Sequence, residues 1–189
     1  MLRYAGGMNN LARFLLAAGL LTLLASCLPV ATLETAEPVN GQQVVVGLTG
    51  VVGVSSDAPA GALPYLAYRW GDGTTEFSVS TQIGLRGAVK QKLADRFSVA
   101  AGLTVPWAVF SSPGGPGLPF TLDAEALFQA TDELTVIGRG MYAAVSDFGS
   151  AWLGGASVVY RQDRWLFEGG FLLSGQGNPL LSVSAGYRF

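Results

Sequence analysis

Two acidic and three basic residues are the groups of this sequence whose type and spacing could do chemistry. Asp123 and Glu125 are two positions apart in a segment where polar and apolar residues alternate. In a β-strand both carboxyl groups would lie on one face, where such a pair could act as general acid and general base. Arg86, Lys90 and Lys92 also share a face in a strand. They could bind an anion such as a phosphate or a lipid headgroup, or set the anion preference of a narrow conduit.

The composition excludes most other active-site chemistry. The 189 residues contain no histidine and one cysteine, which excludes Ser-His-Asp and Cys-His catalysis, histidine metal sites and thiolate zinc sites. The formal net charge of -2 argues against nucleic acid as a partner. We therefore expect no cofactor, no metal and no catalytic residue. Asp123 and Glu125 are interpreted as structural partners of Arg139 and of other arginines.

The N-terminal segment predicts export. Arg3 and Arg13 precede an apolar run at residues 14–24 that only Thr22 interrupts. This run is roughly 11 residues long, whereas a membrane-spanning helix requires about 20. We expect residues 1–26 to be a secretory signal peptide that is removed.

The end of that segment resembles the lipobox of bacterial lipoproteins. The tetrapeptide Leu-Ala-Ser-Cys ends at Cys27, and Leu28 follows it. The resemblance implies that Cys27 is lipidated and becomes the new N-terminus, and the absence of aspartate after it favours the outer membrane. Residues 27–41 contain prolines and no periodicity, so they are predicted to form a lipidated tether. An ordinary signal peptide that contains a cysteine is the alternative.

From residue 42 to residue 189, alternation of apolar and polar side chains predicts β-strands. Short turns alternate with longer loops, which is typical of barrels that span a membrane. The prediction is an all-β fold, an antiparallel up-and-down transmembrane β-barrel. An eight-stranded barrel is the alternative if the hairpin at 42–70 has another role. The ten predicted strands are residues 42–54, 63–70, 75–83, 86–94, 96–109, 120–131, 133–145, 151–161, 164–173 and 180–189.

Some positions support this pattern and others fit it less well. Aromatic residues gather near both ends of the predicted strands, as in the aromatic belts of membrane barrels. Pro106 lacks the N–H that an interior strand residue donates, but it lies near the outer end of its strand, where a bulge could absorb it. Thr81 and Gln91 would be poor contacts for lipid. The long segment 75–93 needs a reversal, which is expected at Gly84 or Gly87.

The C-terminus resembles the last strand of outer-membrane proteins. Leu181, Val183, Tyr187 and the terminal Phe189 carry this resemblance. In that family the strand is recognised by the barrel-assembly machinery, so the resemblance implies that machinery and outer-membrane lipids as partners. With the export signal, the chain is similar to small bacterial outer-membrane β-barrel proteins.

The polar faces of the strands would then line the interior. We expect their charges to pair, because an unpaired charge in a narrow lumen costs several kcal/mol. A ten-stranded barrel is also only slightly wider than an eight-stranded one that side chains fill, which predicts a plugged lumen. The eleven predicted lumen charges, seven positive and four negative, are Arg69, Glu76, Arg86, Lys90, Lys92, Asp123, Glu125, Arg139, Arg161, Glu168 and Arg188.

The resulting functional prediction is a non-enzymatic outer-membrane barrel that is structural, adhesive or a narrow passive conduit. An outer-membrane enzyme fits less well, because the outer-membrane proteases, lipases and lipid A modifying enzymes with barrels of this size rely on a histidine together with serine or aspartate. The alternative is a soluble, lipid-anchored β-barrel that binds a small apolar ligand in the periplasm. That alternative requires the apolar faces to point inward and the charged faces outward.

Overall fold

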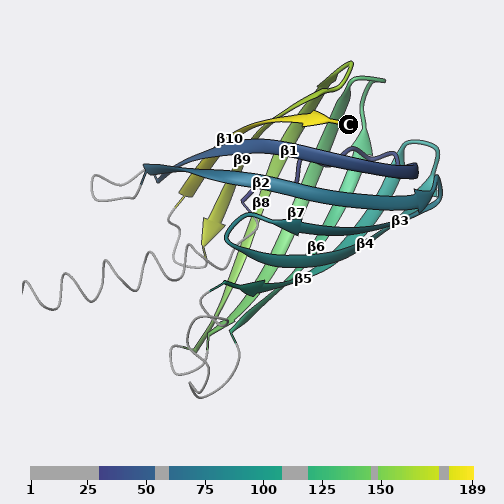
Figure 1. Cartoon of the computed structure of the whole chain (residues 1–189). Helices are drawn as coiled ribbons and strands as arrows, with labels where there is room; N and C mark the ends of the chain where they lie inside the picture. The colour runs from purple at the N-terminus through teal and green to yellow at the C-terminus, as the bar shows by residue number, and fades with distance from the viewer. Residues whose placement is uncertain (1–29, 54–59, 108–118, 146–148, 175–178) are drawn as a thin grey trace, which may run out of the picture.

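The computed structural model describes residues 30–53, 60–107, 119–145, 149–174 and 179–189. These residues form a closed antiparallel barrel in which each strand pairs with its neighbours in the sequence and β1 pairs with β10 (Figure 1). The predicted all-β fold and the count of ten strands are confirmed. The strands are β1 (Asn40–Gly53), β2 (Ala60–Asp72), β3 (Thr75–Thr81), β4 (Gly84–Ala94), β5 (Phe97–Pro106), β6 (Phe120–Gln129), β7 (Leu134–Val145), β8 (Gly149–Gln162), β9 (Trp165–Ser174) and β10 (Pro179–Arg188).

The register closes the sheet on itself. Val45 of β1 lies opposite Ala67 of β2 on one side and Arg188 of β10 on the other. Each of the strands in the described part of the chain thus has two partners, which leaves no free edge for pairing with another chain. One end of the barrel carries the connections 73–74, 95–96, 130–133 and 163–164, and we call it the turn end. The opposite end, which includes the longest connection at 107–119, is the loop end.

Side chains alternate between the two faces of the wall, as the sequence predicts. Along β6, Leu122, Ala124 and Phe128 are exposed on the outside, whereas Asp123 and Glu125 are buried inside. The apolar face therefore points outward, which is the reverse of what a soluble barrel with an apolar interior requires. Among the described residues, no helix has the length and apolarity needed to cross a membrane.

The residues that fit the sequence pattern poorly each have a local explanation. β5 ends at Pro106, and its pairing with β6 already ends at Thr104, so the missing N–H of Pro106 interrupts no ladder on that side. The register shift between β4 and β5 lies at the turn end and not beside Pro106. The indole N–H of Trp107 donates to the hydroxyl of Thr81 at 3.1 Å. Thr75 donates to the side-chain oxygen of Gln91 at 2.7 Å.

The reversal expected inside segment 75–93 lies at residues 82–83, with Gly84 as the first residue of β4. A side chain at Gly84 would meet the backbone oxygen of Val105 at 2.5 Å, so the close approach of β5 requires glycine there. Gly87 lies within β4 and takes no part in the reversal.

Aromatic rings gather at both ends of the barrel wall. At the turn end Tyr187 contacts Trp165 and Phe189, with ring centroids 5.1 Å and 4.9 Å apart. At the loop end Tyr142 and Trp152 lie 4.8 Å apart. Such rings are suited to the two interfaces of a bilayer, where an apolar body and a polar edge are both accommodated.

Residues 30–39 lie inside the barrel, and we call them the luminal segment. The N–H of Val30 donates to the side-chain oxygen of Gln82, in the β3–β4 connection at the loop end. The N–H of Val39 donates to a carboxylate oxygen of Glu76, close to the turn end. The segment therefore runs along the lumen from the loop end to the turn end before β1 begins. The prediction of a tether at 27–41 is corrected for residues 30–39, which lie inside the barrel and bond to side chains of the wall.

Candidate functional site: charge pairs in the lumen

Arg86 of β4 is the centre of the lumen's charge pairs. Its guanidinium donates to both carboxylate oxygens of Asp123, at 3.1 Å and 2.6 Å, in the bidentate geometry that arginine favours. It also donates to Glu34 of the luminal segment at 3.1 Å and lies 3.5 Å from Glu125. All four side chains are at most 3% exposed, so these contacts are sheltered from water.

The absence of a side chain at Gly102 makes the Arg86–Asp123 pair possible. Gly102 lies on β5, between β4 and β6, and faces the lumen opposite Asp123. A Cβ at this position would lie 2.8 Å from the Arg86 Nε and from both Asp123 carboxylate oxygens. Glycine therefore lets the guanidinium cross one strand to reach the carboxylate on the next.

Arg139 of β7 joins two further carboxylates. Glu125 lies directly opposite Arg139 on the neighbouring strand, and the Arg139 Nε is 3.0 Å from a Glu125 oxygen. The Arg139 Nη2 is 3.3 Å from Glu168 of β9 and donates to the hydroxyl of Thr32 at 2.9 Å. Arg139 thus links Glu125 of β6 and Glu168 of β9 to Thr32 of the luminal segment.

A second group of charges lies nearer the turn end. Lys90 is 2.8 Å from Glu76 and 3.8 Å from Glu34. Arg69 lies 3.9 Å from Glu76 and donates to the carbonyl oxygens of Thr32 and Leu33 at 2.7 Å and 3.0 Å. Both groups of charges therefore meet at the luminal segment.

Three of the predicted lumen charges lie apart from these pairs, at the turn-end rim. Arg161 is 3.7 Å from the exposed Glu37 and donates to the carbonyl of Asp132 at 2.5 Å. Arg188 donates to the carbonyl of Asp163. Lys92 is half-buried and belongs to none of the ion pairs found among the described residues. The other predicted lumen charges are buried, namely Arg69, Glu76, Arg86, Lys90, Asp123, Glu125, Arg139 and Glu168.

Apolar side chains also line the lumen, which alternation alone did not predict. Leu33 packs in a buried cluster with inward-facing Leu127, Ile137 and Leu166, which lie near the turn-end boundaries of β6, β7 and β9. A second cluster at the loop end consists of Met141, Ala143 and Leu172, with Leu153 and Leu180 against it. Apolar groups therefore lie towards both ends of the lumen.

The acidic and basic residues that could do chemistry already contact other charged side chains of the lumen. Asp123 and Glu125 are held by arginines, so neither carboxylate is placed to exchange protons with a substrate. Arg86 and Lys90 already contact carboxylates of the chain itself. No group of acidic or cysteine side chains within the described residues is arranged to hold a metal ion. Cys27 and residues 1–26 lie outside the described residues.

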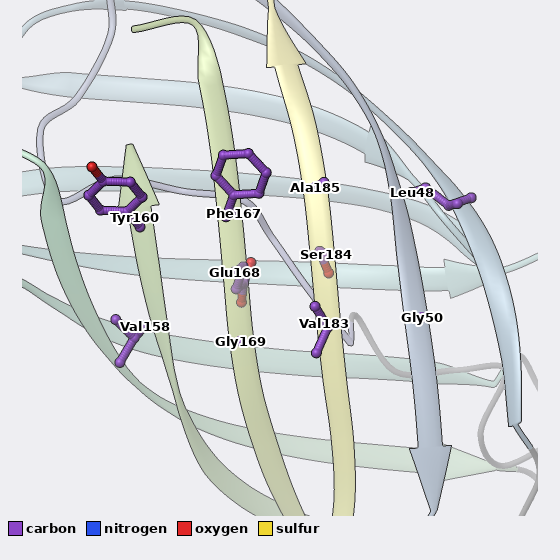
Figure 2. A pocket seen from close by; sticks show the side chains of 10 residues that line it. All are labelled: Leu48, Gly50, Val158, Tyr160, Phe167, Glu168, Gly169, Val183, Ser184 and Ala185. Carbon is purple, nitrogen blue, oxygen red and sulfur yellow. The ribbon is translucent and has the colours of Figure 1, made fainter. Parts of the chain in front are cut away.

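A shallow hollow of about 520 Å³ lies on the outer face of the wall, across β1, β8, β9 and β10. Figure 2 shows that Tyr160 and Phe167 border it on one side and Val183 on another. It exists because Gly50 and Gly169 place no side chain on the outside. The hollow therefore belongs to the apolar outer surface and not to the lumen.

Comparisons with known proteins identify the fold and no closer relationship. No family model matches the chain, and no curated protein matches its sequence. Among solved structures, the KdgM porin matches with 9% identity and a TM-score of 0.53, over 77% of this chain and 99% of that one. The Ail protein of Yersinia pestis matches with 13% identity and a TM-score of 0.35, over 80% and 100%. The chain has the fold of outer-membrane β-barrel proteins, as a closed antiparallel barrel of ten strands.

Proposed function

We propose that this protein is a non-enzymatic outer-membrane barrel whose lumen is closed by its own luminal segment, with a structural or adhesive role. The observation that carries the proposal is the position of Glu34. This side chain is 2% exposed, lies in the middle of the lumen and contacts Arg86 and Lys90 of the wall. A carboxylate held in this way blocks the path that a solute would take.

The outward apolar face supports the membrane location. Val183 is 72% exposed and Trp152 69%, and large apolar side chains are exposed on every strand. Such a surface is far larger than the apolar patches of soluble monomers. Lipidation at Cys27, cleavage after residue 26 and recognition of Leu181, Val183, Tyr187 and Phe189 by the assembly machinery belong to the same proposal.

Planar-bilayer recording tests the closed lumen. The full chain is expected to show no steady conductance, because the luminal segment and the paired charges leave no continuous water path. Glu34→Lys is expected to raise the open probability, because a third cation is then placed beside Arg86 and Lys90. Glu37→Lys is the matched control at the rim. A steady open pore in the unaltered chain would overturn the proposal.

A single arginine on the outer face distinguishes a membrane barrel from a soluble one. Ala124 is exposed at the middle of β6, opposite Ala101 and Gly140. Ala124→Arg is expected to cost about 2–4 kcal/mol of unfolding free energy in lipid, because a cation would then face the hydrocarbon core. Asp95→Arg, in the exposed turn at 95–96, is the control and should have little effect.

The measurement is denaturant unfolding in vesicles, together with partition between the membrane and aqueous fractions. Loss of stability for Ala124→Arg alone supports the membrane location. If both substitutions are tolerated equally and the protein is found in the aqueous fraction, the soluble lipid-anchored alternative is favoured.

A further inference from the structure

We propose that the lumen is a binding site for an extended peptide, which reads a Leu-Glu pair and is occupied here by residues 30–39 of the same chain. The inference rests on the closed lumen proposed above and adds the chemical class of ligand that the lumen recognises. It is carried by contacts to the backbone of the luminal segment, by a notch in the wall for Leu33 and by the two cations around Glu34.

Wall side chains satisfy the backbone of the luminal segment along its length. Lys90 donates to the carbonyl of Thr35 at 3.1 Å, and Ser98 donates to the carbonyl of Ala36 at 2.5 Å. The N–H of Ala36 donates to the Thr135 hydroxyl at 3.3 Å. These bonds use groups that every peptide carries, so they give affinity for an extended chain without reading its sequence.

One carboxylate receives two successive backbone donors. The N–H groups of Thr32 and Leu33 both donate to the same oxygen of Glu168, at 3.0 Å and 2.6 Å. Leu33 has a φ of 50°, in the left-handed region that a leucine rarely adopts. Successive N–H groups that converge in this way form an anion-binding nest, and here Glu168 of the wall is the anion. The wall thus imposes a specific backbone conformation on its occupant.

Two facing glycines form a notch for the leucine. Gly47 of β1 and Gly186 of β10 are register partners, and both face the lumen. A Cβ on Gly186 would lie 2.7 Å from the Leu33 Cδ1, and one on Gly47 would lie 3.0 Å from the same atom. Leu33 is completely buried there, next to Val45. The missing side chains of the wall are therefore complementary to a leucine at this position.

The acidic residue that follows is read by charge. Glu34 contacts Arg86 with one carboxylate oxygen and Lys90 with the other, at 3.1 Å and 3.8 Å. Both cations also have wall carboxylates as partners. The lumen therefore distinguishes peptides by whether they place one further carboxylate between Arg86 and Lys90. A peptide with a neutral residue here loses the ion pairs with Arg86 and Lys90, which then contact only the carboxylates of the wall.

The segment is linked covalently to the barrel only at its turn-end boundary, among the described residues. Asn40 and Gly41 are exposed, Gly41 has a φ of 98°, and a side chain at Gly41 would meet no atom within 4 Å. This is the position where the chain leaves the lumen and enters the wall. A protease site inserted between these two residues is therefore accessible and leaves every lumen contact in place.

The test uses the full chain with this cleavage site, folded first and then cut. The cut barrel is incubated with a fluorescent peptide of residues 30–39 until mass spectrometry shows that the native segment has been released. We expect saturable uptake by the cut barrel and none by the uncut one. Peptides that carry Glu34→Gln or Leu33→Ala are expected to bind at least about tenfold more weakly, and Glu37→Gln equally well.

A size swap tests the notch. Gly186→Ala in the cut full chain is expected to lose binding of the native peptide and to recover it with the Leu33→Ala peptide. Equal binding of all peptides, or no exchange of the cut segment for the added peptide, would overturn the inference. These outcomes are separate from the bilayer recording of the uncut chain, in which a steady pore would overturn the closed lumen itself.

Discussion

Glu34→Gln is expected to lower the free energy of unfolding by about 1.5–3 kcal/mol, because it removes buried charge-assisted contacts of two cations that keep their wall carboxylates. Arg86 and Lys90 would lose the carboxylate that joins them to the luminal segment. Glutamine has nearly the same size as glutamate, so the change in unfolding free energy reports the loss of the negative charge. Denaturant unfolding in detergent, followed by tryptophan fluorescence and by heat-modifiable migration on a gel, measures it.

Glu37→Gln is the matched control in the same segment. The Glu37 side chain is 57% exposed and lies 3.7 Å from Arg161, so its pair is screened by water. We expect a loss of about 0–1 kcal/mol. Equal losses for Glu34→Gln and Glu37→Gln would contradict the buried position of Glu34.

Arg86→Met is expected to be the most damaging substitution in the lumen, with a loss of about 3–5 kcal/mol or more. It keeps most of the apolar volume but leaves Glu34, Asp123 and Glu125 without the guanidinium that all three contact. Arg96→Met, in the exposed turn between β4 and β5, should change stability by no more than about 0.5 kcal/mol. The same unfolding measurement compares the two.

A double substitution shows whether Arg86 acts through its carboxylates. Adding Asp123→Asn to Arg86→Met removes one of the carboxylates that lost its partner, so the two losses should not add. The expected coupling is about 0.5–3 kcal/mol in favour of the double variant. Strictly additive losses would mean that the two side chains do not interact.

The wall of the barrel could be predicted from the sequence, because its faces follow a strict period of two. Placing Leu181 and Val183 outside and Ser182 and Ser184 inside required only that one face be apolar, and the structure has this arrangement. Strand ends differ by a few residues where polar turn residues extend the pairing, as at Asp72. These boundaries depend on turn geometry, which alternation does not encode.

The luminal segment could not be predicted in the same way. Residues 30–39 have no period, since their backbone bonds to wall side chains and not to a neighbouring strand. The charge count gave no signal for Glu34 either. The three surplus cations of the predicted lumen, Lys92, Arg161 and Arg188, lie at the turn-end rim, where Glu37 pairs with Arg161. The buried wall charges are balanced at four cations and four carboxylates, so Glu34 adds a fifth buried carboxylate.

Amide hydrogen exchange of residues 30–39 in the folded, uncut barrel tests the central claim most directly. The N–H groups of Thr32, Leu33, Ala36 and Val39 all donate to wall side chains. We predict that they exchange as slowly as the interior strand amides, whereas Asp95 and Arg96, in the exposed turn between β4 and β5, exchange rapidly. Exchange of residues 30–39 at the rate of an unstructured peptide, in a barrel whose strands remain protected, would contradict a lumen closed by its own chain.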